Sequence, residues 1–132
     1  MQYNRQETFR RTFEHPIPGS FRLIVDGENE ADVEISKRGP CLIVDLSPSG
    51  MRMYSDLSIP KIPGHTVHLA IDVLLNDAPL TLVGHIVWKK PYRDGNQYGI
   101  DLKTDEMIEH TIIKELKMHS RNELAESKKK DK

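Results

Sequence analysis

Between residues 20 and 102, apolar and polar residues alternate in short stretches, a pattern typical of half-buried β-strands. In residues 20–26, for example, Phe21, Leu23 and Val25 fall on one face of an extended chain. Turn signals separate the stretches, and short strands with turns at intervals of about 8–12 residues predict a small antiparallel all-β barrel or sandwich. Further strands are predicted at residues 31–36, 41–46, 51–57, 65–75, 80–90 and 97–102.

The period changes to that of a helix after the last strand, over residues 104–125. Ile108, Ile112 and Leu116 recur every four residues, so they form one apolar stripe on a helix. Thr104 is the predicted N-cap, and the two acidic residues that follow it suit the positive end of the helix dipole. We expect the stripe to pack on the barrel or on its open end.

The remaining segments complete the predicted organisation of a single domain. Residues 1–14 are polar and basic without a regular period, so we expect a flexible, arginine-bearing N-terminal segment. Two prolines and a glycine at residues 16–19 interrupt the chain next, and the barrel is predicted at residues 15–103. Residues 126–132 are almost all charged and are expected to form a frayed tail.

Composition and charge exclude several classes of protein. The formal net charge of the 132 residues is -1, which gives no overall positive field for holding long nucleic acid. The lone cysteine, Cys41, excludes an internal disulfide bond, and its apolar neighbours predict a buried thiol in a strand. The chain starts without the apolar segment of a signal peptide, and its apolar runs are too short to span a bilayer. We therefore expect a cytoplasmic protein without membrane insertion.

Residues 45–50, Asp-Leu-Ser-Pro-Ser-Gly, stand out because they follow a continuous apolar run. Asp and Ser side chains bond local backbone N–H groups, and Gly50 is free to adopt a positive φ, so the segment alone favours a well-made turn. The second interpretation is a binding role, in which the Asp45 carboxylate accepts hydrogen bonds from the N1–H and N2–H₂ groups of a guanine. The pattern by itself leaves both interpretations open.

Arginines gather ahead of the barrel, at Arg5, Arg10 and Arg11. Guanidinium groups pair bidentately with phosphate, and they also bond the O6/N7 edge of guanine or stack on its ring. A basic arm that is merely solvated has the same composition, so the arginines alone do not establish a binding site.

Together, these features resemble the PilZ domain family, which has an RxxxR motif before its first strand and a DxSxxG motif further on. Asp45, Ser47 and Gly50 match DxSxxG at every fixed position. Residues 83–88, Val-Gly-His-Ile-Val-Trp, and residues 97–102, Gln-Tyr-Gly-Ile-Asp-Leu, are similar to the family's last two strands. The resemblance covers most of the chain. The arginine segment, the DxSxxG motif and the last two strands occur in the family's order.

The resemblance implies a six-stranded antiparallel PilZ-type β-barrel, here with a C-terminal α-helix. It implies the bacterial second messenger cyclic di-GMP as the ligand, with no other cofactor and no metal. In the family, arginines hold guanine and phosphate, while the aspartate and serine contact the other guanine. By position, Asp45, Ser47 and Gly50 would form the barrel side of the site.

The arginine motif departs from the family's usual Arg-Arg-x-x-x-Arg pattern. Arg5 and Arg10 take the outer positions, and Gln6 stands where the first arginine of RxxxR belongs. Losing a charged hydrogen bond of this kind costs about 1.5–3 kcal/mol, or roughly ten- to a hundredfold in affinity. Arg5 and Arg11 are candidates for compensating this loss.

Two hypotheses follow, and neither is catalytic. The first is a cyclic di-GMP receptor or adaptor that signals to an unidentified protein partner in motility, exopolysaccharide or biofilm control. The alternative is a PilZ-like protein-interaction module that has lost nucleotide binding, which Gln6 favours. A barrel that binds single-stranded nucleic acid is the least favoured, because only 6% of the residues are aromatic.

Other candidate chemistry is weaker. The sequence has no catalytic triad order, P-loop or dinucleotide fingerprint, so no enzyme is predicted. His65 and His68 would point to opposite faces of a strand, which makes them poor ligands for one metal ion. Trp88 is interpreted as core or rim packing.

Overall fold

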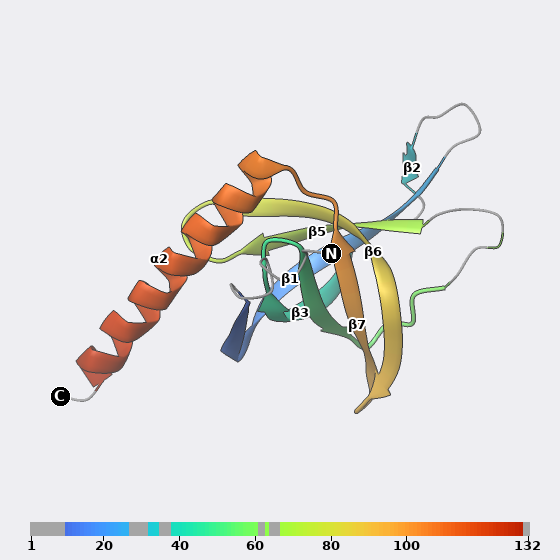
Figure 1. The fold of residues 1–132 in the computed structure, drawn as a ribbon. Coiled ribbons are helices and arrows are strands. Elements are labelled where there is room, and N and C mark those ends of the chain that lie inside the picture. The colour runs from blue at the N-terminus through green and yellow to red at the C-terminus, as the bar shows by residue number, and fades with distance from the viewer. Residues whose placement is uncertain (1–9, 27–31, 35–37, 61–62, 64–66, 131–132) are drawn as a thin grey trace.

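The structure is a computed structural model that describes residues 10–26, 32–34, 38–60, 63 and 67–130. It consists of antiparallel strands with one long helix beside them (Figure 1). The elements are β1 (Arg11–Asp26), β2 (Asp32–Glu34), β3 (Gly39–Leu46), β4 (Gly50–Ser55), β5 (Val67–Leu74), β6 (Pro79–Tyr92), β7 (Gly95–Leu102) and α2 (Glu106–Lys130).

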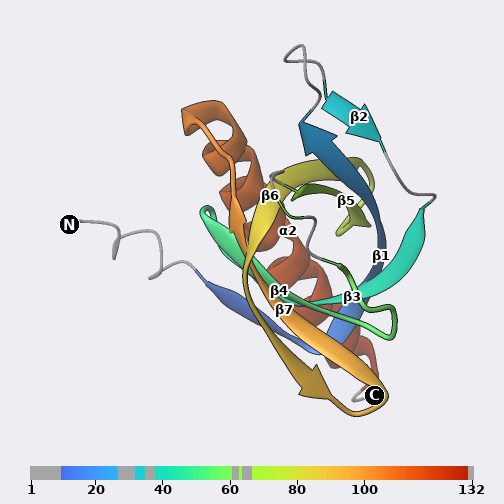
Figure 2. The ribbon, with the colours of Figure 1, turned by 90° about the vertical axis from the view of Figure 1, so that its right-hand side faces the viewer.

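The strands close into a barrel. Their order is β2-β1-β3-β4-β7-β6-β5, and β1 also pairs with β5, so that β1, β3, β4, β7, β6 and β5 form a closed six-stranded ring. Every pairing is antiparallel, and Figure 2 shows the strands curving round to meet. The short β2 pairs with the end of β1 and, among the described strands, with no other. The predicted six-stranded antiparallel barrel with a C-terminal helix is therefore confirmed.

Strand β1 differs from its prediction, because it starts at Arg11, within the segment expected to be flexible. The two prolines do not end the strand. Instead, its pairing with β3 is interrupted between Thr12 and Ile17 and resumes from Ile17 to Phe21. A proline lacks the N–H that a ladder bond needs, and an irregularity of this kind lets the strand continue past it. As a result, the first residues of β1 lie on the barrel.

Alternate residues of the strands fill the barrel. Ile43, Met53, Leu69 and Ile71 are fully buried, as the period-2 pattern predicts. Tyr98 is also fully buried, and its hydroxyl accepts a hydrogen bond from the Ile59 N–H at 3.0 Å and donates one to the Leu57 carbonyl at 2.9 Å. The loop after β4 is thus fastened to the core through a side chain of β7.

Cys41 of β3 carries a free thiol inside the barrel wall, as predicted. Its burial and the nearby negative charge of Asp72 raise the pKa of the Cys41 thiol to about 12. The thiol is therefore protonated at neutral pH.

Helix α2 begins two residues later than predicted and ends later, at Lys130. Asp105, not Thr104, caps it, since the Asp105 carboxylate accepts a hydrogen bond from the Ile108 N–H at 2.9 Å. Ile112 and Leu116 of the predicted stripe are buried against the core. Within the described residues, no helix has both the length and the apolar character to cross a membrane.

Candidate ligand-binding site

The turn between β3 and β4 holds the residues of the DxSxxG motif. Ser47 is fully buried, its N–H donates to the Gly50 carbonyl at 2.8 Å, and its hydroxyl accepts from the Gly50 N–H at 3.1 Å. Gly50 does not use a positive φ, contrary to the expectation from the turn. It provides space, since a Cβ there would lie 3.1 Å from the Ile100 carbonyl oxygen and 3.9 Å from Nη2 of Arg10. The turn therefore leaves room for Arg10 beside it.

Asp45 lies between two arginines. Its side chain is only 3% exposed, its Oδ1 lies 2.8 Å from Nη1 of Arg10, and its Oδ2 lies 3.0 Å from Nη2 of Arg52. Asp45 and Arg52 are direct cross-strand partners, and the β3–β4 register shifts between Ile43 and Asp45. Charge-assisted bonds of this kind are among the strongest in proteins. In this arrangement the carboxylate has almost no surface to offer a ligand, whereas each arginine side chain is about one-third exposed.

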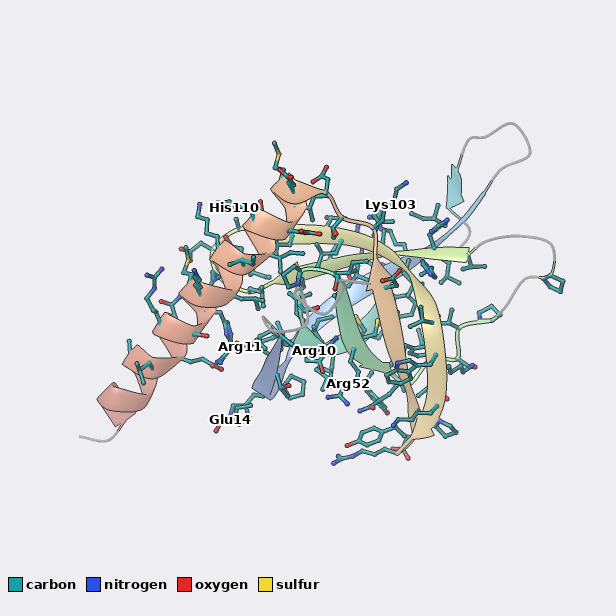
Figure 3. All side chains as sticks on the ribbon, viewed as in Figure 1. Arg10, Arg11, Glu14, Arg52, Lys103 and His110 are labelled. Atoms are coloured by element: carbon teal, nitrogen blue, oxygen red, sulfur yellow. The ribbon has the colours of Figure 1, made fainter. Side chains whose placement is uncertain are left out.

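These side chains border an open pocket of about 500 Å³ on the outer face of the barrel. Figure 3 shows Arg10, the residue before β1, and Arg52, from β4, on the same part of this face. The pocket is lined by residues from five strands and the β3–β4 turn: Arg10, Thr12, Asp45, Ser49, Gly50, Met51, Arg52, Val87, Trp88, Gly99, Ile100 and Asp101.

Trp88 forms one wall of the pocket. A Cβ at Gly99 would overlap the indole ring, so the ring lies directly against the Gly99 backbone. The β6–β7 register shifts between Ile86 and Trp88, and Nζ of Lys90 lies 5.4 Å from the centre of the indole. Trp88 is 40% exposed, so it packs at the rim and leaves an aromatic surface open.

The structure brings together four of the predicted site residues and separates another. Arg10, Asp45, Ser47 and Gly50 meet at the β3–β4 turn, whereas Arg11 points to α2 and pairs with Glu123. The last predicted residue, Arg5, lies outside the described residues, as does Gln6.

Sequence reasoning missed Arg52 as a site residue. The signal was available, because Arg52 is a polar residue between Met51 and Met53, two residues after the motif glycine. Since both methionines are buried, alternation along a strand places Arg52 on the outer face, beside the motif.

No group of three or more His, Cys, Asp or Glu side chains in the described part of the chain is arranged to hold a metal ion. Of the two histidines considered in the sequence, His65 lies outside the described residues.

Comparisons with known proteins identify the family. No curated protein is significantly similar to the chain. Among solved structures, the PilZ domain with c-di-GMP of YcgR from Escherichia coli is similar at 14% identity and a TM-score of 0.49, covering 87% of this chain and 96% of that one. The family model described as PilZ domain matches residues 4–118. The chain therefore belongs to the PilZ domain family.

Proposed function

We propose that this chain is a receptor for cyclic di-GMP, which binds in the pocket next to the β3–β4 turn. One observation carries the proposal: Arg10 is fixed by the buried Asp45 on the wall of an open pocket that Trp88 also lines. Membership of a family whose best-known ligand is this dinucleotide supports the same conclusion.

The chemistry of the pocket suits the ligand. Cyclic di-GMP is a compact dianion with two guanines, and Arg10 offers a guanidinium that pairs with phosphate or with the O6/N7 edge of guanine. Trp88 offers an exposed aromatic face, on which a base stacks. The volume of about 500 Å³ falls in the range of roughly 300–1,000 Å³ that is usual for small-molecule sites.

We also propose that ligand binding is transmitted to a protein partner, in motility, exopolysaccharide or biofilm control. The neighbour of Arg10 in the chain, Arg11, pairs with Glu123 of α2. A ligand that moves Arg10 therefore also moves the adjacent Arg11, and with it the contact between β1 and α2. The helix surface is the expected place where a partner detects the bound state.

Isothermal titration with cyclic di-GMP tests the receptor function, with GTP and cyclic di-AMP as control ligands. We expect saturable binding of cyclic di-GMP alone. Arg10→Ala should abolish the heat of binding, while circular dichroism shows an intact barrel. Arg38→Ala is a matched control, since Arg38 pairs with an aspartate, Asp72, but does not line the pocket. Retained affinity in Arg10→Ala would remove this pocket from consideration.

The alternative is a PilZ-like interaction module that has lost nucleotide binding, and the observation in its favour is Gln6 at a motif arginine position. In that case cyclic di-GMP would leave the thermal midpoint of the unmodified protein unchanged. The variant Gln6→Arg would then create a ligand-dependent increase. A clear increase in the unmodified protein would exclude this alternative.

A further inference from the structure

The pocket contains a second arginine that no part of the family motif provides. Arg52 lies in the middle of β4, directly opposite Asp45 on one side and Gly99 on the other. Its side chain is 34% exposed, close to the 35% of Arg10, and both line the pocket. The two guanidinium groups thus reach the same cavity from β4 and from the residue before β1, with Asp45 between them.

Asp45 is shared between two guanidinium groups, because one of its oxygens contacts Arg10 and the other contacts Arg52. In addition, Nε of Arg52 is buried and has no hydrogen-bond partner among the described residues. Arg52 thus contacts Asp45 through Nη2, while about a third of its side chain stays exposed at the pocket. A guanidinium in this situation is suited to a phosphate, which accepts two parallel N–H bonds.

The wall formed by Trp88 indicates that the ligand also carries a ring that stacks on the indole. Gly99 has no side chain, and the Trp88 indole covers it, so the indole lies next to the cross-strand position of Arg52. An exposed indole beside a guanidinium combines a stacking surface with an anion-binding group. The neighbouring Asp101 is 58% exposed at the rim and brings the opposite charge, so the positive part of the pocket is the side where Arg10 and Arg52 meet.

We propose that Arg52 is a ligand-binding residue, and that it forms with Arg10 a two-arginine clamp for the phosphates of the nucleotide. Asp45 is the positioning residue that sets the two guanidinium groups at the correct spacing. The clamp places a second positive charge in the pocket without any contribution from the uncharged Gln6. This inference rests on the proposed function, because it names a further residue of the same site.

The decisive variant is Arg52→Gln, titrated with cyclic di-GMP at two or more salt concentrations. We expect the Kd to rise about tenfold to a hundredfold, the usual effect of losing a charged hydrogen bond. We also expect the Kd to become less sensitive to salt, because one of the two attracting charges is gone. Arg38→Gln removes a surface charge outside the pocket that also pairs with an aspartate, although its side chain is more exposed (55% against 34% for Arg52), and it should change neither quantity.

The outcomes separate this inference from the proposed function. If the unmodified protein does not bind cyclic di-GMP, the receptor function itself is wrong. If the unmodified protein binds and Arg52→Gln binds equally well, only the clamp is wrong. A larger Kd for Arg52→Gln that depends on salt as strongly as the Kd of the unmodified protein would also overturn the clamp. It would mean that Arg52 acts only by supporting Asp45. Should Arg52→Gln fail to fold, Arg52→Lys keeps the charge but loses the bidentate geometry, and an unchanged Kd there would overturn the clamp too.

Discussion

Arg10 and Arg11 are neighbours in the chain, and each pairs with a carboxylate, but their surroundings differ. Arg10 pairs with Asp45, whose side chain is 3% exposed, on the wall of the ligand pocket. Arg11 pairs with Glu123 of α2, whose side chain is 32% exposed. Successive residues of an extended chain point to opposite faces, so one short segment serves both the pocket and the helix.

The comparison shows that similar ion pairs have different consequences. A buried carboxylate that loses its partners is left with an uncompensated charge, so the arrangement around Asp45 is rigid. A pair whose side chains are both about one-third exposed is partly screened by water and contributes little, so the contact of Arg11 with Glu123 is easy to release. The first pair suits a preformed binding site, and the second suits a contact that changes with the state of the protein.

Removing the buried carboxylate is expected to have the largest effect. In Asp45→Ala, Arg10 and Arg52 are left facing each other in a half-buried place without the charge that holds them. We expect the free energy of unfolding to fall by about 3 kcal/mol, measured by urea denaturation. Asp101→Ala, at the exposed rim of the same pocket, is the control and should change it by less than about 0.5 kcal/mol. Equal effects of the two variants would show that Asp45 is not the organising charge.

A methyl group at Gly99 is expected to have the next largest effect. Because a Cβ there would overlap the Trp88 ring, Gly99→Ala must displace the indole or the strand, at a cost of about 1–3 kcal/mol in stability. The displaced ring should shift the tryptophan fluorescence, and the affinity for cyclic di-GMP should fall roughly tenfold, or about 1.4 kcal/mol.

The double variant Gly99→Ala with Trp88→Ala tests this explanation. If Gly99→Ala acts on binding through the indole, the double variant should bind no more weakly than Trp88→Ala alone. Additive losses in affinity would indicate that Gly99 affects the pocket by another route.

The barrel could be predicted because alternation along a strand is a local signal. The predicted strand at residues 97–102, for instance, lies within β7 (Gly95–Leu102). The start of β1 could not be predicted. Two prolines there argue against a strand, and its pairing with β3 depends on residues far along the chain. The end of α2 was missed for a related reason: a run of charged residues indicates a solvated tail, but Glu and Lys are also good helix formers.

The motif predicted the β3–β4 turn, but not how its aspartate is used. The pairing of Asp45 with Arg52 depends on a register shift after Ile43, which leaves no trace in the sequence. Read alone, Arg52 is an ordinary polar residue on the outer face of a strand. Its proximity to Arg10 becomes visible only when three strands are placed side by side.

Replacing Arg11 tests whether the two arginines are as separate as the structure places them. We expect Arg11→Ala to change the Kd for cyclic di-GMP by less than about twofold, because Arg11 does not line the pocket. Stability should fall by about 0.5–1 kcal/mol, since the pair with Glu123 is lost and Arg11 also lines a groove along α2. A tenfold loss of affinity would instead mean that Arg11 leaves Glu123 for the ligand, where it would compensate for the charge missing at Gln6.

The smallest expected effect is the coupling between Arg11 and Glu123 themselves. A double-mutant cycle with Arg11→Ala and Glu123→Ala should give a coupling energy of about 0.5 kcal/mol, which decreases at high salt. The helix stays in place without the pair, because Phe13 still packs edge-on against His119 at 5.3 Å, and Ile112 remains in the core. A coupling energy of several kcal/mol would mean that α2 is fixed at this point, and the route from the pocket to the helix surface would have to lie elsewhere.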